Sequence, residues 1–284
     1  MSRTSALALM CLAPVLWSTA GVVTRHVEHA TPFEMVFWRS LFAFLFVTAV
    51  LLILRKPPRL SRPLLISGAM WGLMFTAFMI ALSLTTTANA LVVMSVGPFA
   101  TTLLARAFLK ADPVPLGTWL AAGAAALGIA WMFASDLAAH SARDLTGMLV
   151  ALSIPIASAV NVVTLRAAST EFDLRPAVML GGAISCLVAL PLALPFQASG
   201  KDIALLGLLG IFQLALPCLL LVLASRHLLA PEIALIGLLE VVLGPLWAWL
   251  GAGEVPARST VTGGAIVLGA LVVNELATFR RVQV

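Results

Sequence analysis

Two ionic residues lie deep inside apolar segments of this sequence, and they are its first candidates for chemistry. Arg39 lies in the run FEMVFWRSLFAF, and Glu240 lies in the run IGLLEVVLGPLW. A charged residue at the centre of a membrane helix costs roughly 2.5–3.5 kcal/mol on insertion scales, so each needs a partner or a wet cavity. Arg39 either ties helix ends or carbonyl groups together or contacts a substrate carboxylate. Glu240 is either a structural acid bonded to a neighbouring helix or a carboxylate that carries a coupling proton.

Aromatic and uncharged polar residues in similar segments are the second group of candidates. Polar groups within spans normally face the bundle interior or a wet cavity, and an indole flanked by hydroxyls suits a wall that stacks on a flat apolar substrate. Ordinary helix packing explains the same residues, and a stripe at four-residue spacing also fits a core or a lipid-facing surface. We expect a substrate cavity lined by Glu240 and by these residues: Trp17, Ser18, Trp71, Phe75, Met79, Asn89, Ser158, Asn161 and Gln213.

The composition requires that membrane-spanning helices position these side chains. Of the 284 residues, 61% are hydrophobic and 10% are charged, whereas about 25% of the residues of a soluble domain are charged. The apolar runs are about twenty residues long, the length that crosses a bilayer core. The first run is too long, and too closely followed by others, for a cleaved signal peptide. We predict an all-α membrane protein with ten transmembrane helices, over residues 6–24, 33–54, 63–82, 88–109, 116–134, 145–165, 176–196, 203–224, 232–251 and 260–279.

Other kinds of chemistry find little support. Cys11, Cys186 and Cys218 lie in apolar segments without metal-ligand or redox spacing, so we interpret them as lipid-facing or packing thiols. The sequence contains no GxSxG, HExxH or P-loop motif. We therefore expect neither an enzyme nor an ATPase within this chain, no metal, no cofactor and no nucleic-acid partner.

Lysine and arginine are distributed unevenly between alternate loops, and positive residues favour the cytoplasmic side of a membrane. If the N-terminus is cytoplasmic, the inner segments hold twelve of these residues and the outer loops hold four. Both termini are therefore expected in the cytoplasm, and so compact a chain suits a bacterial cytoplasmic membrane. The inner set is Arg3, Arg55, Lys56, Arg59, Arg62, Arg106, Lys110, Arg166, Arg175, Arg226, Arg280 and Arg281, and the outer set is Arg25, Arg143, Lys201 and Arg258.

A weak internal repeat divides the chain into two halves. Residues 9–24 and 149–164 share six of sixteen positions without a gap, and their offset of 140 residues is nearly half of the length. Each half would hold five spans, an odd number, so the second copy would enter the membrane from the opposite side. Inverted repeats build many secondary transporters, with the substrate site near mid-membrane between the halves. We predict one repeat over residues 1–140 and an inverted one over residues 141–284.

Two Gly-Pro pairs occupy corresponding places in the predicted halves. Gly97-Pro98 lies in the fourth span and Gly244-Pro245 lies in the ninth. Such a pair frees backbone groups and bends a helix, although membrane helices tolerate single glycines and prolines generally. Because the pairs match, we expect both to act as hinges.

Three stretches of this chain resemble one known family. PVLWSTAGVVTR in the first span, FEMVFWRSLFAF in the second and LLEVVLGPLWAWLGAGEVP in the ninth are similar to the EamA-domain proteins of the drug/metabolite transporter superfamily, most of all to the YddG-type aromatic amino-acid exporters. The resemblance covers essentially the whole chain. It implies a basket-like bundle in which helices 1–4 and 6–9 surround a central cavity, and export of amino acids or other small metabolites without ATP hydrolysis. One departure is that Val241, where related sequences often have proline, follows Glu240.

Together these observations predict a secondary transporter that exports aromatic or small neutral amino acids by alternating access, driven by facilitated diffusion or by proton exchange. The alternatives are an exporter of hydrophobic drugs or cations, for which Glu240 is the discriminator, and a lipid flippase. The expected partners are a small-molecule substrate and membrane lipid, with the chain as a monomer or a weak homodimer.

Overall fold

Every regular element that the structure describes is helical. The computed structural model describes residues 1–24, 26–55, 58–85, 87–109, 115–132, 141–252 and 257–282. Seven of its helical segments are long and apolar enough to cross a membrane. The chain is therefore a polytopic membrane protein, as its composition predicts.

The N-terminal half comprises seven helices. Ser2 begins the first of them by accepting a hydrogen bond from the Ser5 amide at 3.1 Å. Thr31 and Glu34 form a capping box at the start of the third, where Pro32 has no amide to satisfy. The helices are α1 (Arg3–Trp17), α2 (Ala20–Thr24), α3 (Pro32–Ile53), α4 (Arg62–Leu84), α5 (Thr87–Met94), α6 (Gly97–Phe108) and α7 (Leu116–Met132).

The C-terminal half begins with the longest helix and contains one π-helix. Pro155 lies within the first helix, which nevertheless remains unbroken. The π-helix precedes Pro217, which has no amide hydrogen to donate to the carbonyl of Gln213. The elements are α8 (Ala142–Ala168), α9 (Arg175–Ala193), α10 (Gly200–Leu208), η1 (Leu209–Ala215), α11 (Leu216–Ala224), α12 (Ala230–Gly237), α13 (Leu239–Ala252) and α14 (Arg258–Val282).

The seven long segments coincide with seven of the ten predicted spans: Arg3–Thr24, Pro32–Ile53, Arg62–Leu84, Asn89–Phe108, Ala142–Ala168, Arg175–Ala193 and Gly200–Ala224. Two more predicted spans coincide with the shorter apolar helices Leu116–Met132 and Arg258–Asn274. The predicted ninth span is divided between α12 and α13.

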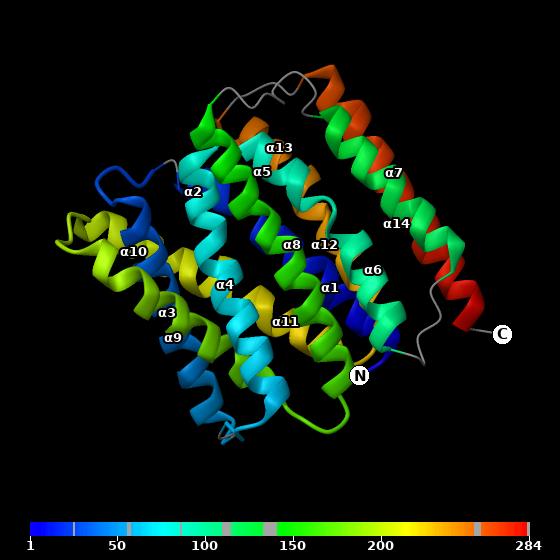
Figure 1. The fold of residues 1–284 in the computed structure, drawn as a ribbon, viewed down its shortest axis with the longest axis horizontal. Coiled ribbons are helices and arrows are strands. Elements are labelled where there is room, and N and C mark those ends of the chain that lie inside the picture. The colour runs from blue at the N-terminus through cyan, green and yellow to red at the C-terminus, as the bar shows by residue number, and fades with distance from the viewer. Residues whose placement is uncertain are drawn as a thin grey trace.

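The helices form one bundle with a peripheral pair (Figure 1). Helices α7 and α14 run side by side along one edge, and α3 and α9 pack together at the opposite edge. Between them α4 packs along α8, and α1 packs on α11. The start of α1 and the end of α14 lie at the same end of the bundle (Figure 1). Helices from both halves of the sequence therefore alternate throughout the core.

Three predicted spans are interrupted: the first at residues 18–19, between α1 and α2, the fourth between α5 and α6, and the ninth between α12 and α13. Helix α5 ends at Met94 and α6 begins at Gly97, so the first Gly-Pro pair lies at the break. In the ninth span the break is at Leu238, and Gly244-Pro245 lies inside the continuous helix α13. Pro98 occupies the first turn of α6, where a missing amide hydrogen costs no intrahelical bond.

A glycine seam allows α9 to approach α4 closely. A methyl group at Gly181 would collide with Cβ of Trp71 and would lie 3.1 Å from the backbone nitrogen of Gly72. We expect Gly181→Ala to destabilise the protein by about 1–3 kcal/mol, the usual cost of overpacking a core. The measurement is the thermal unfolding midpoint of the purified protein. The control is Gly269→Ala, because a methyl group there meets no atom within 4 Å; equal midpoints for the two variants would contradict the expectation.

Candidate functional site

A cavity of about 190 Å³ lies in the centre of the bundle. Its walls come from α1, α3, α4, α6, α8, η1, α11, α12 and α13, together with Met94 at the end of α5. Seven of the ten predicted cavity residues line it: Trp17, Trp71, Phe75, Ser158, Asn161, Gln213 and Glu240. Gly97 and Pro98 line it as well, so the break between α5 and α6 lies against the cavity.

Ser18, Met79 and Asn89 lie elsewhere. The Ser18 hydroxyl accepts a hydrogen bond from Nε1 of Trp247 at 2.8 Å, and the Asn89 amide donates to the Thr85 hydroxyl at 3.1 Å. Met79 packs in a separate apolar cluster with Val36. An α-helix turns about 100° per residue, so Met79 is rotated by about 80° from Trp71. Phe78 is rotated by only about 20° and lines the cavity in its place.

Arg39 reaches the cavity from α3 and is bound to the protein by one hydrogen bond. Its side chain is 2% exposed, and Nη2 donates to the carbonyl oxygen of Phe75 at 3.1 Å. Nε has no hydrogen-bond partner. Within the described ranges no acid pairs with Arg39, so part of its hydrogen-bonding capacity is unused at the cavity wall.

Glu240 reaches the cavity from the first turn of α13, immediately after the break at Leu238. A helix N-terminus carries a partial positive charge, which stabilises a carboxylate in the first turn. Among the residues that the structure describes, none forms a hydrogen bond or an ion pair with this carboxylate. Arg39 and Glu240 both line this cavity, and the described residues include no ion pair between them.

Several uncharged polar atoms at the cavity are also buried without a protein partner. They include Nε1 of Trp71, Nδ2 of Asn161 and Oε1 of Gln213. Buried polar atoms in folded proteins are nearly always hydrogen-bonded, so each exception requires an explanation. The remaining polar atoms of two of these amides are engaged, because Oδ1 of Asn161 accepts from the Ser67 hydroxyl at 2.6 Å and Nε2 of Gln213 donates to the carbonyl of Trp17 at 3.3 Å.

The π-helix positions Gln213. The backbone amide of Leu216 donates to the carbonyl of Ile211, five residues earlier, and this longer loop of hydrogen bonding widens the helix locally. Short π-helical segments inside α-helices occur frequently at functional sites. The apolar pattern of residues 203–224 does not predict this π-helix. Pro217, which follows it, is the one residue in the sequence that could have indicated it.

Cys218 is a packing thiol, one of the two alternatives that the sequence left open, because it lies buried in the main apolar core. It also lines the cavity, which the sequence did not predict. Its spacing from Leu214 is one helical turn, so it shares a face with the η1 residues that line the cavity. The wall also contains three thioethers and a hydroxyl that the sequence pattern did not predict: Met10, Met74, Met94 and Thr101.

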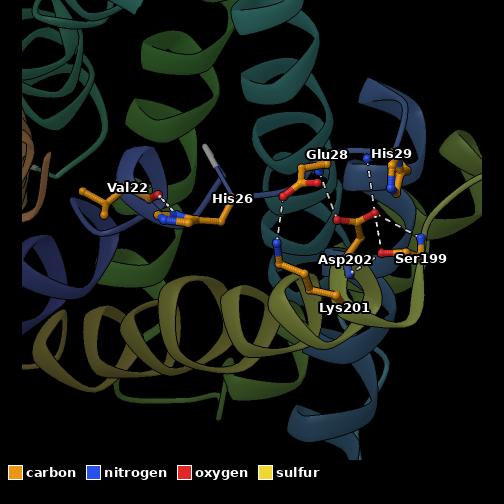
Figure 2. Close-up of polar contacts among 7 residues, drawn as sticks. All are labelled: Val22, His26, Glu28, His29, Ser199, Lys201 and Asp202. Atoms are coloured by element: carbon orange, nitrogen blue, oxygen red, sulfur yellow. Dashed lines mark hydrogen bonds and ion pairs between the residues drawn. The ribbon is translucent and has the colours of Figure 1, made fainter.

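A polar cluster closes one end of the bundle (Figure 2). The carboxylate of Asp202, at the start of α10, accepts hydrogen bonds from the backbone amides of Glu28 at 3.0 Å and His29 at 3.2 Å. It also accepts from the amide and the hydroxyl of Ser199 at 3.0 and 2.9 Å. Lys201 pairs with Glu28 at 2.8 Å, and that hydrogen bond lowers the pKa of Glu28. The loop before α3 is thereby tied to the opposite half of the chain.

We expect Asp202→Ala to release this loop. The substitution removes the charged acceptor of the Glu28 and His29 amides, in hydrogen bonds that are partly buried, at a cost of about 1–3 kcal/mol. The measurement is hydrogen exchange of the peptide that spans residues 26–31, which should exchange faster. Lys201→Ala is the control, since its ion pair is exposed and pairs of this kind contribute little. Unchanged exchange in Asp202→Ala would contradict the expectation.

Ionic contacts also join helices at the other end of the bundle. Nη2 of Arg3 pairs with Oε1 of Glu232 at 2.5 Å, which connects the starts of α1 and α12. Asp173 accepts a hydrogen bond from Nε of Arg175 at 2.9 Å, and this bond is the main reason that its pKa is lowered. Among the residues that the structure describes, no group of three or more His, Cys, Asp or Glu side chains has the arrangement of a metal site.

The fold and the cavity define a class before any particular relationship is considered. A bundle of membrane-spanning helices from both halves of a chain, enclosing a partly polar cavity, is the construction of a membrane transporter. Residues 4–134 match the profile of the EamA-like transporter family. This part of the chain is therefore similar to that family, in agreement with the resemblance found in the sequence.

Two kinds of known protein are similar to the whole chain. The pseudopaline exporter CntI of Pseudomonas aeruginosa, from strains UCBPP-PA14 and PAO1, is 26% identical over 94% of this chain and 95% of its own length. A solved crystal structure superimposes with a TM-score of 0.84 at 19% identity, over 97% of this chain and 100% of that one. The fold is therefore one that has been seen by experiment.

Proposed function

We propose that this protein exports aromatic or small neutral amino acids and related metabolites across a bacterial cytoplasmic membrane, without ATP. The observation that carries the proposal is the central cavity, which combines aromatic walls with two ionic residues that do not pair with each other. Its position between helices of both halves is the usual position of the binding site in secondary transporters. The relative in Pseudomonas aeruginosa is an exporter, which supports the outward direction.

The size of the cavity favours a small metabolite over a drug. Pockets that bury drug-sized ligands have volumes of about 300–1,000 Å³, whereas this cavity has about 190 Å³. The rings of Trp17, Trp71 and Phe75 offer flat apolar surfaces against which an aromatic or aliphatic side chain can pack. A hydrophobic cation would also use Glu240 and these rings, so cationic drugs belong in the test of the proposal.

The pairing of helices supports alternating access by two inverted halves. The contact between α4 and α8 corresponds to the contact between α11 and α1. In the same way, the contact between α4 and α9 corresponds to the contact between η1 and α3. The interrupted fourth and ninth spans, α5–α6 and α12–α13, occupy the same place in each half. Rocking at these breaks would expose the cavity to one side and then to the other. The excess of positive residues in alternate loops supports cytoplasmic termini.

The experiment is counterflow of labelled amino acids into liposomes that contain only this protein. Phenylalanine, threonine and glycine form the panel, with a hydrophobic cationic drug as a competitor and with and without a pH step. The proposal predicts uptake without ATP that other amino acids inhibit. Uptake that follows the pH step would add proton exchange to it, whereas no uptake of any amino acid in the panel would contradict it.

A further inference from the structure

Apart from the Thr101 hydroxyl on α6, which can both donate and accept, the partnerless polar atoms around the cavity are separated by kind. The atoms on α3, α4 and α8 are hydrogen-bond donors: Nε of Arg39, Nε1 of Trp71 and Nδ2 of Asn161. The groups on η1 and α13 are acceptors, namely Oε1 of Gln213 and the carboxylate of Glu240. Each wall also carries one formal charge, positive on Arg39 and negative on Glu240.

The orientation of the Gln213 amide follows from its contact with α1. Nε2 of Gln213 donates to the carbonyl of Trp17, and a reversed amide would set two oxygen atoms against each other. Oε1 of Gln213 is therefore the free atom. Nε of Arg39 and Nε1 of Trp71 are donors in every state of these side chains. The contrast between the two walls thus rests on Arg39, Trp71 and Gln213, whose roles are fixed, whereas the Ser67 hydroxyl can pair with either end of the Asn161 amide.

The positions of the donors are linked through α4. Arg39 binds the carbonyl of Phe75, and the Phe75 ring lies 5.5 Å from the Trp71 ring, one turn earlier on the same helix. Asn161 joins this wall from α8 through its bond with Ser67 of α4. On the other side, Gln213 is held by the carbonyl of Trp17 and Glu240 by the start of α13.

We propose that the cavity binds a zwitterion in a single orientation, with its carboxylate against Arg39, Trp71 and Asn161 and its ammonium group against Gln213 and Glu240. This inference rests on the proposed function and assigns the residues that determine specificity within that site. A carboxylate accepts several hydrogen bonds and an ammonium group donates three. Both ends of the substrate would then form hydrogen bonds with buried atoms that have no partner in the protein. A buried polar atom without a hydrogen bond costs free energy, so these bonds favour binding.

The test compares three ligands as inhibitors of counterflow in each variant. The ligands are the amino acid that the wild-type protein transports best, its methyl ester, and its deaminated analogue. Each modified ligand should inhibit wild type about 10- to 100-fold more weakly, the effect of losing a charged hydrogen bond. Arg39→Gln should lose discrimination against the ester and keep it against the deaminated analogue. Glu240→Gln should show the reverse, and Met79→Leu, outside the cavity, should behave as wild type.

The reciprocal pattern separates a binding role from a structural one. A residue that only supports the fold would weaken all three ligands together, and that result would overturn the assignment while leaving amino-acid export intact. Equal discrimination in wild type and both variants would overturn it as well. If wild type transports no amino acid, the proposed function fails, and this inference fails with it.

Discussion

Replacing Arg39 by methionine is expected to reduce transport of the best amino acid by about a hundredfold or more. The guanidinium donates one hydrogen bond to the carbonyl of Phe75, and its Nε has no partner within the protein. Removal of the positive charge therefore deprives a substrate carboxylate of its charged partner. The measurement is the initial rate of counterflow at saturating and at low substrate. Arg39→Lys, which keeps the charge but not the planar fork, should retain an intermediate rate.

The alternative reading of Arg39 makes a different prediction for the same variant. If the residue serves only to tie α3 to α4, Arg39→Met should lose stability and should not purify as a single species. A variant that remains folded and transports at the wild-type rate would contradict both readings. Thermal unfolding of the detergent-solubilised protein, measured beside transport, distinguishes these outcomes.

The second large effect concerns the break between α5 and α6. Pro98 has no amide hydrogen for the carbonyl of Met94, four residues earlier, so the two helices cannot join into one hydrogen-bonded ladder. Pro98→Ala supplies that hydrogen and favours a continuous helix. We expect the maximal exchange rate to fall by about five- to tenfold with little change in apparent affinity, since about 1 kcal/mol in the balance between conformations has an effect of this size.

Gly244→Ala is the matched control for the break. A methyl group at Gly244 meets no atom within 4 Å, and the residue lies inside the continuous helix α13. Alanine should therefore stabilise this helix without slowing transport. If Gly244→Ala slows exchange as strongly as Pro98→Ala does, the hinge of the ninth span lies at the Gly-Pro pair of the sequence and not at Leu238.

The number and place of the apolar segments follow from the sequence because lipid requires long uninterrupted runs. Periodicity also identified one face of α4, since Trp71 and Phe75 line the cavity together. It could not predict that Phe78 continues this face in place of Met79. That choice depends on how the helix is rotated about its axis, which the neighbouring helices decide.

Three features of the site depend on tertiary contacts and were not predictable. Ser18 lies beside cavity residues in sequence, but Trp247 engages its hydroxyl. The π-helix reorients Gln213, and Cys218 shares its wall because η1 continues directly into α11. Asp202 and Glu34, which look like ordinary first-turn acids, each bind backbone amides of a distant loop.

The central claim is that substrate occupies the cavity, and Cys218 provides a native reporter for it. In the variant Cys11→Ala/Cys186→Ala, modification of Cys218 by a small methanethiosulfonate reagent can be followed by mass spectrometry. A transported amino acid at ten times its dissociation constant should slow the modification by about tenfold, because it leaves about one site in eleven empty. Modification at the same rate with and without a transported amino acid would contradict the account.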